Sequence, residues 1–418
     1  MEVRIISREI IKPSSSSPSH LRTYKLSLMD QLSIHADFSI ILFYSTGAKV
    51  SDHLKRSLSE TLTHYYPFAG RVKDYFSVDC NDSGVTFLEA GVEGNISDIL
   101  KQPEIDMLKQ LLPHEQSSTQ VIVAVQVNYF DCGGVAISVC FRHVIADAAA
   151  ATNFIKSWAT IASGGKDIKD LIFDCSSIFP PTDLFGSYTS NAEKTMLKLS
   201  TDYIQKRFVF DKSKIVALQE KIGSRTTRFE AVSALVWGAI IAAKRETREY
   251  IPSEFVATIP INLRKRMNPP ISEQCIGNIS TSTIAQWPTE ETINYSDLVE
   301  KLRKSTTVMN ENHVRNAYAD GKWFLKLINL IGRDIQTSCF ISSLCRLPFY
   351  EADFGWEKPT WTTLVRQHQP EDIPNTLILL DTRDGEGIET WVGLPGVDMA
   401  KFKQNPDILA YASFNPSI

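Results

Sequence analysis

The stretch from residue 120 to residue 163 constrains the fold more than any other part of the chain. Val121, Val123, Val125, Val127 and Tyr129 recur at every second position, which predicts a β-strand. Residues 131–134, Asp-Cys-Gly-Gly, are typical of a turn, and the apolar run 135–141 predicts a returning strand. Apolar residues at helical spacing then predict a helix over 147–163. A β-hairpin therefore leads directly into a helix.

Two polar side chains, His143 and Asp147, lie at the junction between this hairpin and the helix. The unperturbed pKa of histidine is about 6.5, so His143 is a candidate general base at neutral pH. On spacing alone, a hydrogen-bonded loop histidine without a catalytic role is the better interpretation. Asp147 is expected to cap the helix, because its carboxylate can accept hydrogen bonds from backbone N–H groups. The small residues 148–150 either leave room for a ligand or simply favour a helix.

The sequence shows no other local pattern for catalysis or cofactor binding. It has no glycine-rich phosphate loop and no Gly-x-Ser-x-Gly nucleophile elbow. The eight histidines are dispersed without metal-ligand spacing, so no metal site is expected. Cys140 is near His143 but on a predicted strand, where a cysteine is usually a small buried apolar residue. We expect no tightly bound cofactor.

The length of the chain suggests two domains. A chain of 418 residues is too long for one ordinary core. We predict an N-terminal domain over 1–175, a polar crossover linker over 176–204 and a C-terminal domain over 205–418. The second domain is predicted to contain strands near 207–210, 255–263, 338–344, 376–382 and 387–392, with helices from about 213, over 228–244 and within 295–332.

Composition and charge exclude several classes of partner. The formal net charge is −4 and the basic residues are scattered, which argues against nucleic acid as a main partner. No run of about 18 apolar residues is present, so no membrane-spanning helix is expected. The N-terminal residues 1–9 alternate like a strand and lack the apolar core of a signal peptide. The seven cysteines contain no Cys-x-x-Cys pair, which favours reduced thiols and a cytoplasmic protein.

Two segments of the second half also stand out. Asp353-Phe354-Gly355-Trp356 places a glycine between two aromatic residues. It is either a ligand clamp or a tight bend in which Asp353 bonds to the backbone or to an arginine, and the bend is favoured. Arg264 follows a predicted strand and could pair with a buried carboxylate, hold a phosphate or remain a surface residue.

Taken together, these segments resemble the plant acyl-CoA-dependent acyltransferases known as the BAHD family. The pattern 143–147, His-x-x-x-Asp, followed about 200 residues later by Asp-Phe-Gly-Trp at 353–356, is specific to that family. The likeness covers nearly the whole chain and is greatest to the alkaloid branch of vinorine synthase and salutaridinol acetyltransferase. It is also carried by the segments Tyr24–Ser27, Asp30–Leu32, Tyr65–Arg71, Phe130–Gly134, Lys206–Phe210, Asn262–Arg264, Arg266–Pro270 and Asp381–Arg383.

The resemblance implies an α/β fold of two similar domains, each a mixed β-sheet flanked by helices and joined by a crossover loop, as in chloramphenicol acetyltransferase. Residues of about 355–380 are expected to pack into the N-terminal sheet. By family likeness His143 is the general base, while Asp147 is structural and pairs with Arg264. Asp353 and Gly355 belong to a structural segment remote from the chemistry. Contacts to coenzyme A are expected from the second domain, at Ser224, Thr226, Thr227, Arg228 and Asn278.

Two positions depart from the family pattern. Glu357 stands where the family has a second glycine, and Leu344 stands where many relatives have tryptophan. Residues other than glycine or asparagine resist a positive φ, so the bend at Glu357 either does not need one or is altered. Both positions are in segments thought to be structural, so we expect altered packing rather than lost activity.

The function implied is transfer of an acyl group, expected to be acetyl, from acyl-CoA to a hydroxyl of a bulky plant metabolite. The acceptor is an alkaloid or terpenoid alcohol, and transfer is direct, without an acyl-enzyme. The alternatives are an amine N-acyltransferase and a non-catalytic binding protein that keeps the fold. Neither membrane insertion nor nucleic-acid binding is expected, and we expect a monomer.

Overall fold

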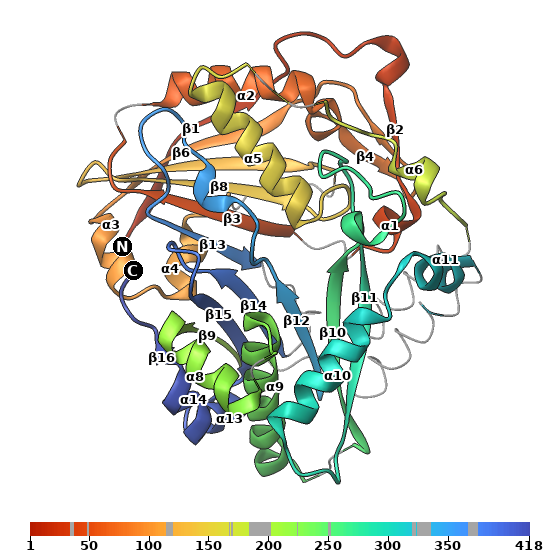
Figure 1. Ribbon diagram of the computed structural model, residues 1–418. Coiled ribbons are helices and arrows are strands. Elements are labelled where there is room, and N and C mark those ends of the chain that lie inside the picture. The colour runs from red at the N-terminus through yellow and green to blue at the C-terminus, as the bar shows by residue number, and fades with distance from the viewer. Residues whose placement is uncertain are drawn as a thin grey trace.

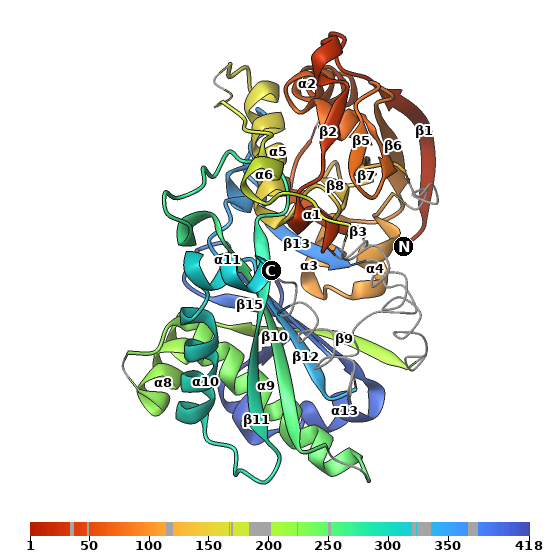
Figure 2. The same ribbon diagram turned by 90° about the vertical axis from the view of Figure 1, so that its right-hand side faces the viewer.

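Two mixed β-sheets, each with its own apolar core, form the frame of the molecule. The computed structural model describes residues 1–33, 37–47, 50–113, 120–166, 168, 170–183, 202–223, 225–249, 252–319, 323, 336–366 and 375–418. The first sheet has the strand order β1-β6-β7-β8-β3-β13 and the second β11-β10-β12-β14-β15-β9-β16. A smaller sheet, β2-β5-β4, lies beside the first (Figure 1). The two large sheets and their helices stack as two halves (Figure 2).

The first half contains most of the chain before residue 180. Its strands are β1 (Val3–Ile11), β2 (Thr23–Lys25), β3 (Asp37–Tyr44), β4 (Arg71–Asp74), β5 (Ser77–Asp79), β6 (Val85–Val92), β7 (Val123–Phe130) and β8 (Val135–Arg142). Its helices are α1 (Leu28–Gln31), α2 (Ser51–His64), α3 (Ile96–Lys101), α4 (Ile105–Gln110), α5 (Ala148–Ala162) and α6 (Cys175–Ile178).

The second half carries the larger sheet. Its strands are β9 (Tyr203–Phe210), β10 (Glu254–Asn262), β11 (Ser280–Pro288), β12 (Ser338–Ser343), β14 (Thr376–Asp381), β15 (Ile388–Pro395) and β16 (Ser413–Phe414). Its helices are α8 (Lys212–Ile222), α9 (Arg228–Thr247), α10 (Tyr295–Thr307), α11 (Glu311–Ala319), α13 (Gly396–Phe402) and α14 (Pro406–Tyr411). No helix among the described residues is both long and apolar enough to cross a membrane.

The predicted hairpin and helix are present. β7 and β8 pair antiparallel from Val123↔Phe141 to Tyr129↔Val135, and Gly133 in the turn has a φ of 83°. Helix α5 begins after Asp147, whose side chain accepts a hydrogen bond from the Ala150 N–H. β14 and β15 also form the expected hairpin.

Sequence periodicity missed strands whose buried face is not aliphatic. In β11 the buried positions are Thr281, Thr283, Ala285 and Trp287, whereas Ile284 faces outward. The buried threonines pack as β-branched residues but read as polar in a hydrophobic pattern. The linker expected over 176–204 lies partly outside the described residues, which exclude 184–201. At its C-terminal end, strand β9 begins at Tyr203, two residues before the expected start of the second domain.

Strand β13 (Trp361–Arg366) comes from the second half of the chain but lies in the first sheet (Figure 2). It pairs antiparallel with β3, from Trp361↔Phe43 to Arg366↔Phe38. β14, which begins at Thr376, lies instead in the second sheet. Of the region 355–380, the strand 361–366 therefore joins the N-terminal sheet and the residues from 376 on do not.

A buried ion pair fastens β13 to the second sheet. Arg207 of β9 and Glu389 of β15 are 2.7 Å apart, with side chains only 3% and 4% exposed. The indole Nε1 of Trp361 donates to the Glu389 carboxylate over 3.1 Å. Trp391 Nε1 donates in turn to Thr363 Oγ1 over 2.9 Å. The two sheets are therefore joined by polar contacts inside an apolar layer.

We predict that Glu389→Gln lowers the free energy of unfolding by about 3–5 kcal/mol, because Arg207 stays buried without a counter-charge. Urea denaturation would measure the loss. Glu386→Gln is the control, because Glu386 pairs with Lys212 at the exposed surface and its loss should cost less than about 1 kcal/mol. Equal losses in the two variants would contradict the role of the buried pair.

Candidate active site

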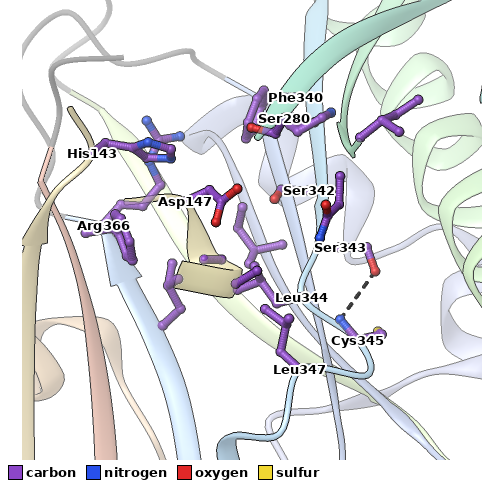
Figure 3. A pocket seen from close by; sticks show the side chains of 18 of the residues that line it. His143, Asp147, Ser280, Phe340, Ser342, Ser343, Leu344, Cys345, Leu347 and Arg366 are labelled. Carbon is purple, nitrogen blue, oxygen red and sulfur yellow. Dashed lines mark hydrogen bonds between the residues drawn. The ribbon is translucent and has the colours of Figure 1, made fainter. Parts of the chain in front are cut away.

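A cavity of about 1080 Å³, including its open mouth, lies where the two halves meet. Its wall on the first half is formed by the start of β3, His143, the start of α5 and the end of β13. Its wall on the second half is formed by the ends of β10 and β12 and the start of β11 (Figure 3). Most of the side chains on these walls are apolar, and the polar ones come from both walls, with His143 on one side and Ser342 and Ser343 on the other (Figure 3).

His143 follows β8 directly and lines this cavity (Figure 3). The ring of Phe38 packs against the imidazole in an edge arrangement, with ring centroids 5.1 Å apart. His143 Nδ1 lies 2.9 Å from Asn278 Oδ1. Burial lowers the pKa of His143 below the ordinary value of 6.5, because it disfavours the imidazolium. The imidazole is therefore neutral at neutral pH.

The hydrogen bonds of Asn278 determine which ring nitrogen carries the proton. Asn278 Nδ2 donates to Asp30 Oδ1 over 3.0 Å and to the His143 carbonyl oxygen over 2.6 Å. Both partners accept only, so the amide oxygen must be the atom that faces the ring. His143 Nδ1 then donates to that oxygen, which leaves the lone pair on Nε2. A neutral imidazole held in this way is prepared to accept a proton at Nε2.

Asp30 accepts the hydrogen bonds that hold Asn278 in place beside His143. It is fully buried, forms a capping box with Ser27 at the start of α1, and accepts from the Asn278 backbone N–H over 2.7 Å. Burial raises the pKa of Asp30 to about 6 against the effect of these hydrogen bonds. The Ser27-x-x-Asp30 pattern would have indicated the cap. The pattern does not predict the hydrogen bond between Asp30 and Asn278, which are 248 residues apart in the sequence.

Asp147 and Arg264 form the buried ion pair that the resemblance implies. Arg264 Nη1 is 2.8 Å from Asp147 Oδ2, and Nη2 is 3.2 Å from Oδ1. The same carboxylate accepts from the N–H groups of Ala150 and Ile279 over 2.9 and 3.0 Å. Although burial raises the pKa of Asp147, the Arg264 charge and these donors hold it below its ordinary value. The Asp147 carboxylate thus holds α5, β11 and Arg264 together.

Of the residues expected to contact coenzyme A, the four that the structure describes, Thr226, Thr227, Arg228 and Asn278, do not line this cavity. Thr227 caps α9 in a capping box with Glu230, and Thr226 is buried. Arg228 donates to the Gly385 carbonyl oxygen and to Asp381. Ser224 lies outside the described residues.

Asn278 has a contact that the sequence analysis did not predict. It is 1% exposed, and its side chain hydrogen-bonds to Asp30 and His143, so it positions the imidazole. Its distance from His143 in the sequence, 135 residues, hid this contact from pattern analysis. Its contact to coenzyme A stays a prediction.

The segment from Asp353 to Trp356 is a bend far from His143. Asp353 Oδ1 accepts from the Gly355 N–H over 2.9 Å, and Gly355 has a φ of 102°. A Cβ on Gly355 would lie 3.4 Å from Ser163 Cα, which follows the last turn of α5. His143 precedes the first turn of α5, and a helix of 15 residues spans about 22 Å. The bend packs against the opposite end of that helix from the cavity.

The two departures from the family pattern have different consequences. Glu357 does not have a positive φ, and its Oε1 accepts from the Thr46 N–H over 2.9 Å, so the bend does not need a second glycine. Leu344, where altered packing was expected, is buried and also lines the cavity (Figure 3). The residue at position 344 therefore shapes the space beside His143.

Comparison with known proteins agrees with this geometry. The model of the Transferase family matches residues 1–409. A limonoid 1-O-acetyltransferase and a limonoid 21-O-acetyltransferase, both from Citrus sinensis, are each 46% identical, and the matches cover 100% of both chains.

The crystal structure of vinorine synthase is 33% identical, with a TM-score of 0.87 and full coverage of both chains. The predicted fold class, two mixed sheets flanked by helices, is confirmed by this match. The match of family, fold and full-length relatives shows that the chain belongs to the BAHD family of acyl-CoA-dependent acyltransferases.

Proposed function

We propose that this protein transfers an acetyl group from acetyl-CoA to a hydroxyl of a limonoid or a similar polycyclic alcohol, with His143 as the general base. The observation that carries the proposal is His143 on the cavity wall, with Nδ1 held by Asn278. The two limonoid relatives, equally identical to this chain, are named for different positions, 1-O and 21-O. Overall similarity therefore favours a limonoid acceptor without selecting its hydroxyl.

The reaction needs one base and no covalent intermediate. Nε2 of His143 takes the proton of the acceptor hydroxyl as its oxygen attacks the thioester carbonyl carbon. The C–S bond then breaks as the tetrahedral intermediate collapses. The imidazolium returns its proton to the departing thiolate, so His143 ends the cycle neutral. Asn278 Oδ1 accepts from Nδ1 throughout and favours the charged imidazolium during the step.

The cavity wall suits an apolar acceptor. Its large apolar members are Phe38, Ile261, Phe340, Leu344, Leu347, Leu364 and Ile378. Burying the hydrocarbon frame of a polycyclic alcohol against such a wall provides binding energy of about 25 cal/mol per Å². Polar groups on the acceptor then fix its orientation.

We predict that His143→Ala lowers the rate of acetyl transfer by at least about 10²–10⁴-fold, because the proton acceptor is lost. The measurement is release of free coenzyme A with limonoid alcohols and, in parallel, with amines of similar size. Thermal unfolding should change little. His20→Ala, at an exposed position, is the matched control. Undiminished turnover in His143→Ala contradicts the assignment, and preferred turnover of amines contradicts the alcohol acceptor.

The pH dependence of kcat/KM gives a separate prediction. Neutral His143 is the active form and burial lowers its pKa, so activity should persist through neutral pH and fall only below pH 6.5. Asp30, with a pKa of about 6, titrates in the same range. The profile is therefore repeated in Asp30→Asn, where the acid limb should remain. A midpoint above pH 6.5 would contradict a neutral buried base.

Asp147 variants separate its structural role from a catalytic one. Asp147→Ala should lower the free energy of unfolding by about 3–5 kcal/mol through the broken buried pair and by about 1 kcal/mol more through the lost cap. Asp147→Asn keeps a capping oxygen and should therefore recover the smaller of these two losses, the one that comes from the cap. Chemical denaturation measures both. An Asp147→Ala variant as stable as the parent yet inactive would show that Asp147 acts directly on the imidazole.

A further inference from the structure

Two buried thiols, one from each half of the molecule, lie next to each other outside the cavity. Cys175 begins α6, and Cys275 belongs to the connection between β10 and β11. Their Sγ atoms are 2.9 Å apart, although the two residues are 100 positions apart in the sequence. Both residues are buried, and neither lines the cavity beside His143. The proposed mechanism uses neither thiol.

Hydrogen bonds of the backbone bring the two thiols together. The Ile172 N–H donates to the Gln274 carbonyl oxygen over 3.1 Å, and the Ile276 N–H donates to the Ile172 carbonyl oxygen over 2.9 Å. These bonds form an isolated parallel bridge between Ile172 and Cys275. The connection between β10 and β11 reaches into the first half, where α6 lies (Figure 1). The contact between the thiols therefore lies where the two halves meet.

The connection that carries Cys275 also carries Asn278, whose side chain holds the imidazole of His143. A Cβ added at Gly277 would lie 3.2 Å from Cys175 Sγ, so the backbone of this connection passes close to that sulfur. A bond between the two sulfurs would therefore tie the segment that positions the imidazole to the first half of the molecule.

We propose that Cys175 and Cys275 form an oxidation site, at which a peroxide produces a reversible disulfide that locks the two halves together beside the active site. The two sulfurs are already in contact, so the bond needs little movement of the backbone. The disulfide would close a loop of about 100 residues, and a cross-link over such a length stabilises a fold mainly by restricting the unfolded chain.

The surroundings of the pair give the two sulfurs different roles. The contact with Cys175 lowers the pKa of Cys275 most, burial raises it and the Arg264 charge lowers it again, so that it lies below its ordinary value. The pKa of Cys175 is raised, first by its contact with Cys275 and then by burial. Cys275 therefore reacts as the thiolate, which is the nucleophilic form, while Cys175 keeps its proton.

The reaction with hydrogen peroxide balances without another reagent. The Cys275 thiolate attacks one oxygen of the peroxide, the O–O bond breaks, and a sulfenic acid and a hydroxide form. The Cys175 sulfur then attacks the Cys275 sulfur, the S–O bond breaks, and the second oxygen leaves as hydroxide. The protons of the two thiols convert both hydroxides into water. A dithiol reductant reverses the disulfide by thiol exchange.

Peroxide reaches the buried pair when α6 opens. This helix has only four residues, Cys175–Ile178, and Asp174 and Ser177 around Cys175 are exposed. Short elements at the surface open locally at a small cost in free energy, far below that of global unfolding. The pair can therefore be oxidised in the folded protein.

The test treats the parent, Cys175→Ala and Cys275→Ala with hydrogen peroxide and then blocks the remaining thiols. Peptide mapping should find Cys175 joined to Cys275 in the parent. The midpoint of thermal unfolding should rise by at least about 3 °C when the parent is oxidised and by less than about 1 °C in each variant. Each protein is compared with its own reduced form, so the packing that a variant loses cancels. Dithiothreitol should remove both the cross-link and the shift.

Cys132→Ala is the matched control, because Cys132 is exposed and is therefore the thiol that peroxide reaches most easily. This variant should form the cross-link and gain the shift as the parent does. Absence of the cross-link from the oxidised, folded parent would overturn the proposal. A cross-link that leaves the unfolding midpoint unchanged would reject the lock, and so would a shift that persists in Cys175→Ala. Neither readout needs a substrate, so the result is independent of the proposed function.

Discussion

The buried pair of Asp147 and Arg264 is the contact on which the site depends. It joins the first turn of α5, in one half, to the end of β10, in the other, with Arg264 fully buried. Arg264 also donates to the carbonyl oxygens of Cys275 and Gly277, which immediately precede Asn278. Removing either charge would leave the other buried and uncompensated, at a cost of about 3–5 kcal/mol. The two halves are therefore held in the one arrangement that brings Asn278 to His143.

The ion pair between Asp147 and Arg264 explains why the spacing between His143 and Asp147 matters although the two side chains have different roles. Asp147 must begin the helix and meet Arg264 at the same time, which fixes the loop between β8 and α5. His143 then receives its orientation from Asn278, which is itself anchored on Asp30. His143 and Asp147 lie at the two ends of one loop. The residue that determines the tautomer of the imidazole, Asn278, comes from the other half of the chain.

Local patterns were sufficient for the parts of the protein built from local contacts. The β7–β8 hairpin, the cap at Asp147 and the β14–β15 hairpin follow from periodicity and turn residues. The position of β13 beside β3 could not follow from them, because pairing across more than 300 residues leaves no local mark. The contact of Asn278 with His143 could not be predicted for the same reason, because an asparagine after a glycine in a loop is typical of an ordinary turn. Family likeness supplied the pairing of Asp147 with Arg264, but not the place of Leu344 on the cavity wall.

A buried hydrogen-bond network and a largely apolar cavity wall meet beside His143. Asp30 accepts hydrogen bonds from Asn278, and Asp147 accepts from Arg264 and from the N–H of Ile279, the residue after Asn278. Phe340, Leu344 and Arg366 line the cavity, and the Arg366 guanidinium lies over the Phe340 ring. Substitutions at such positions would alter the shape and polarity of the cavity beside His143 while leaving the hydrogen bond between His143 and Asn278 in place.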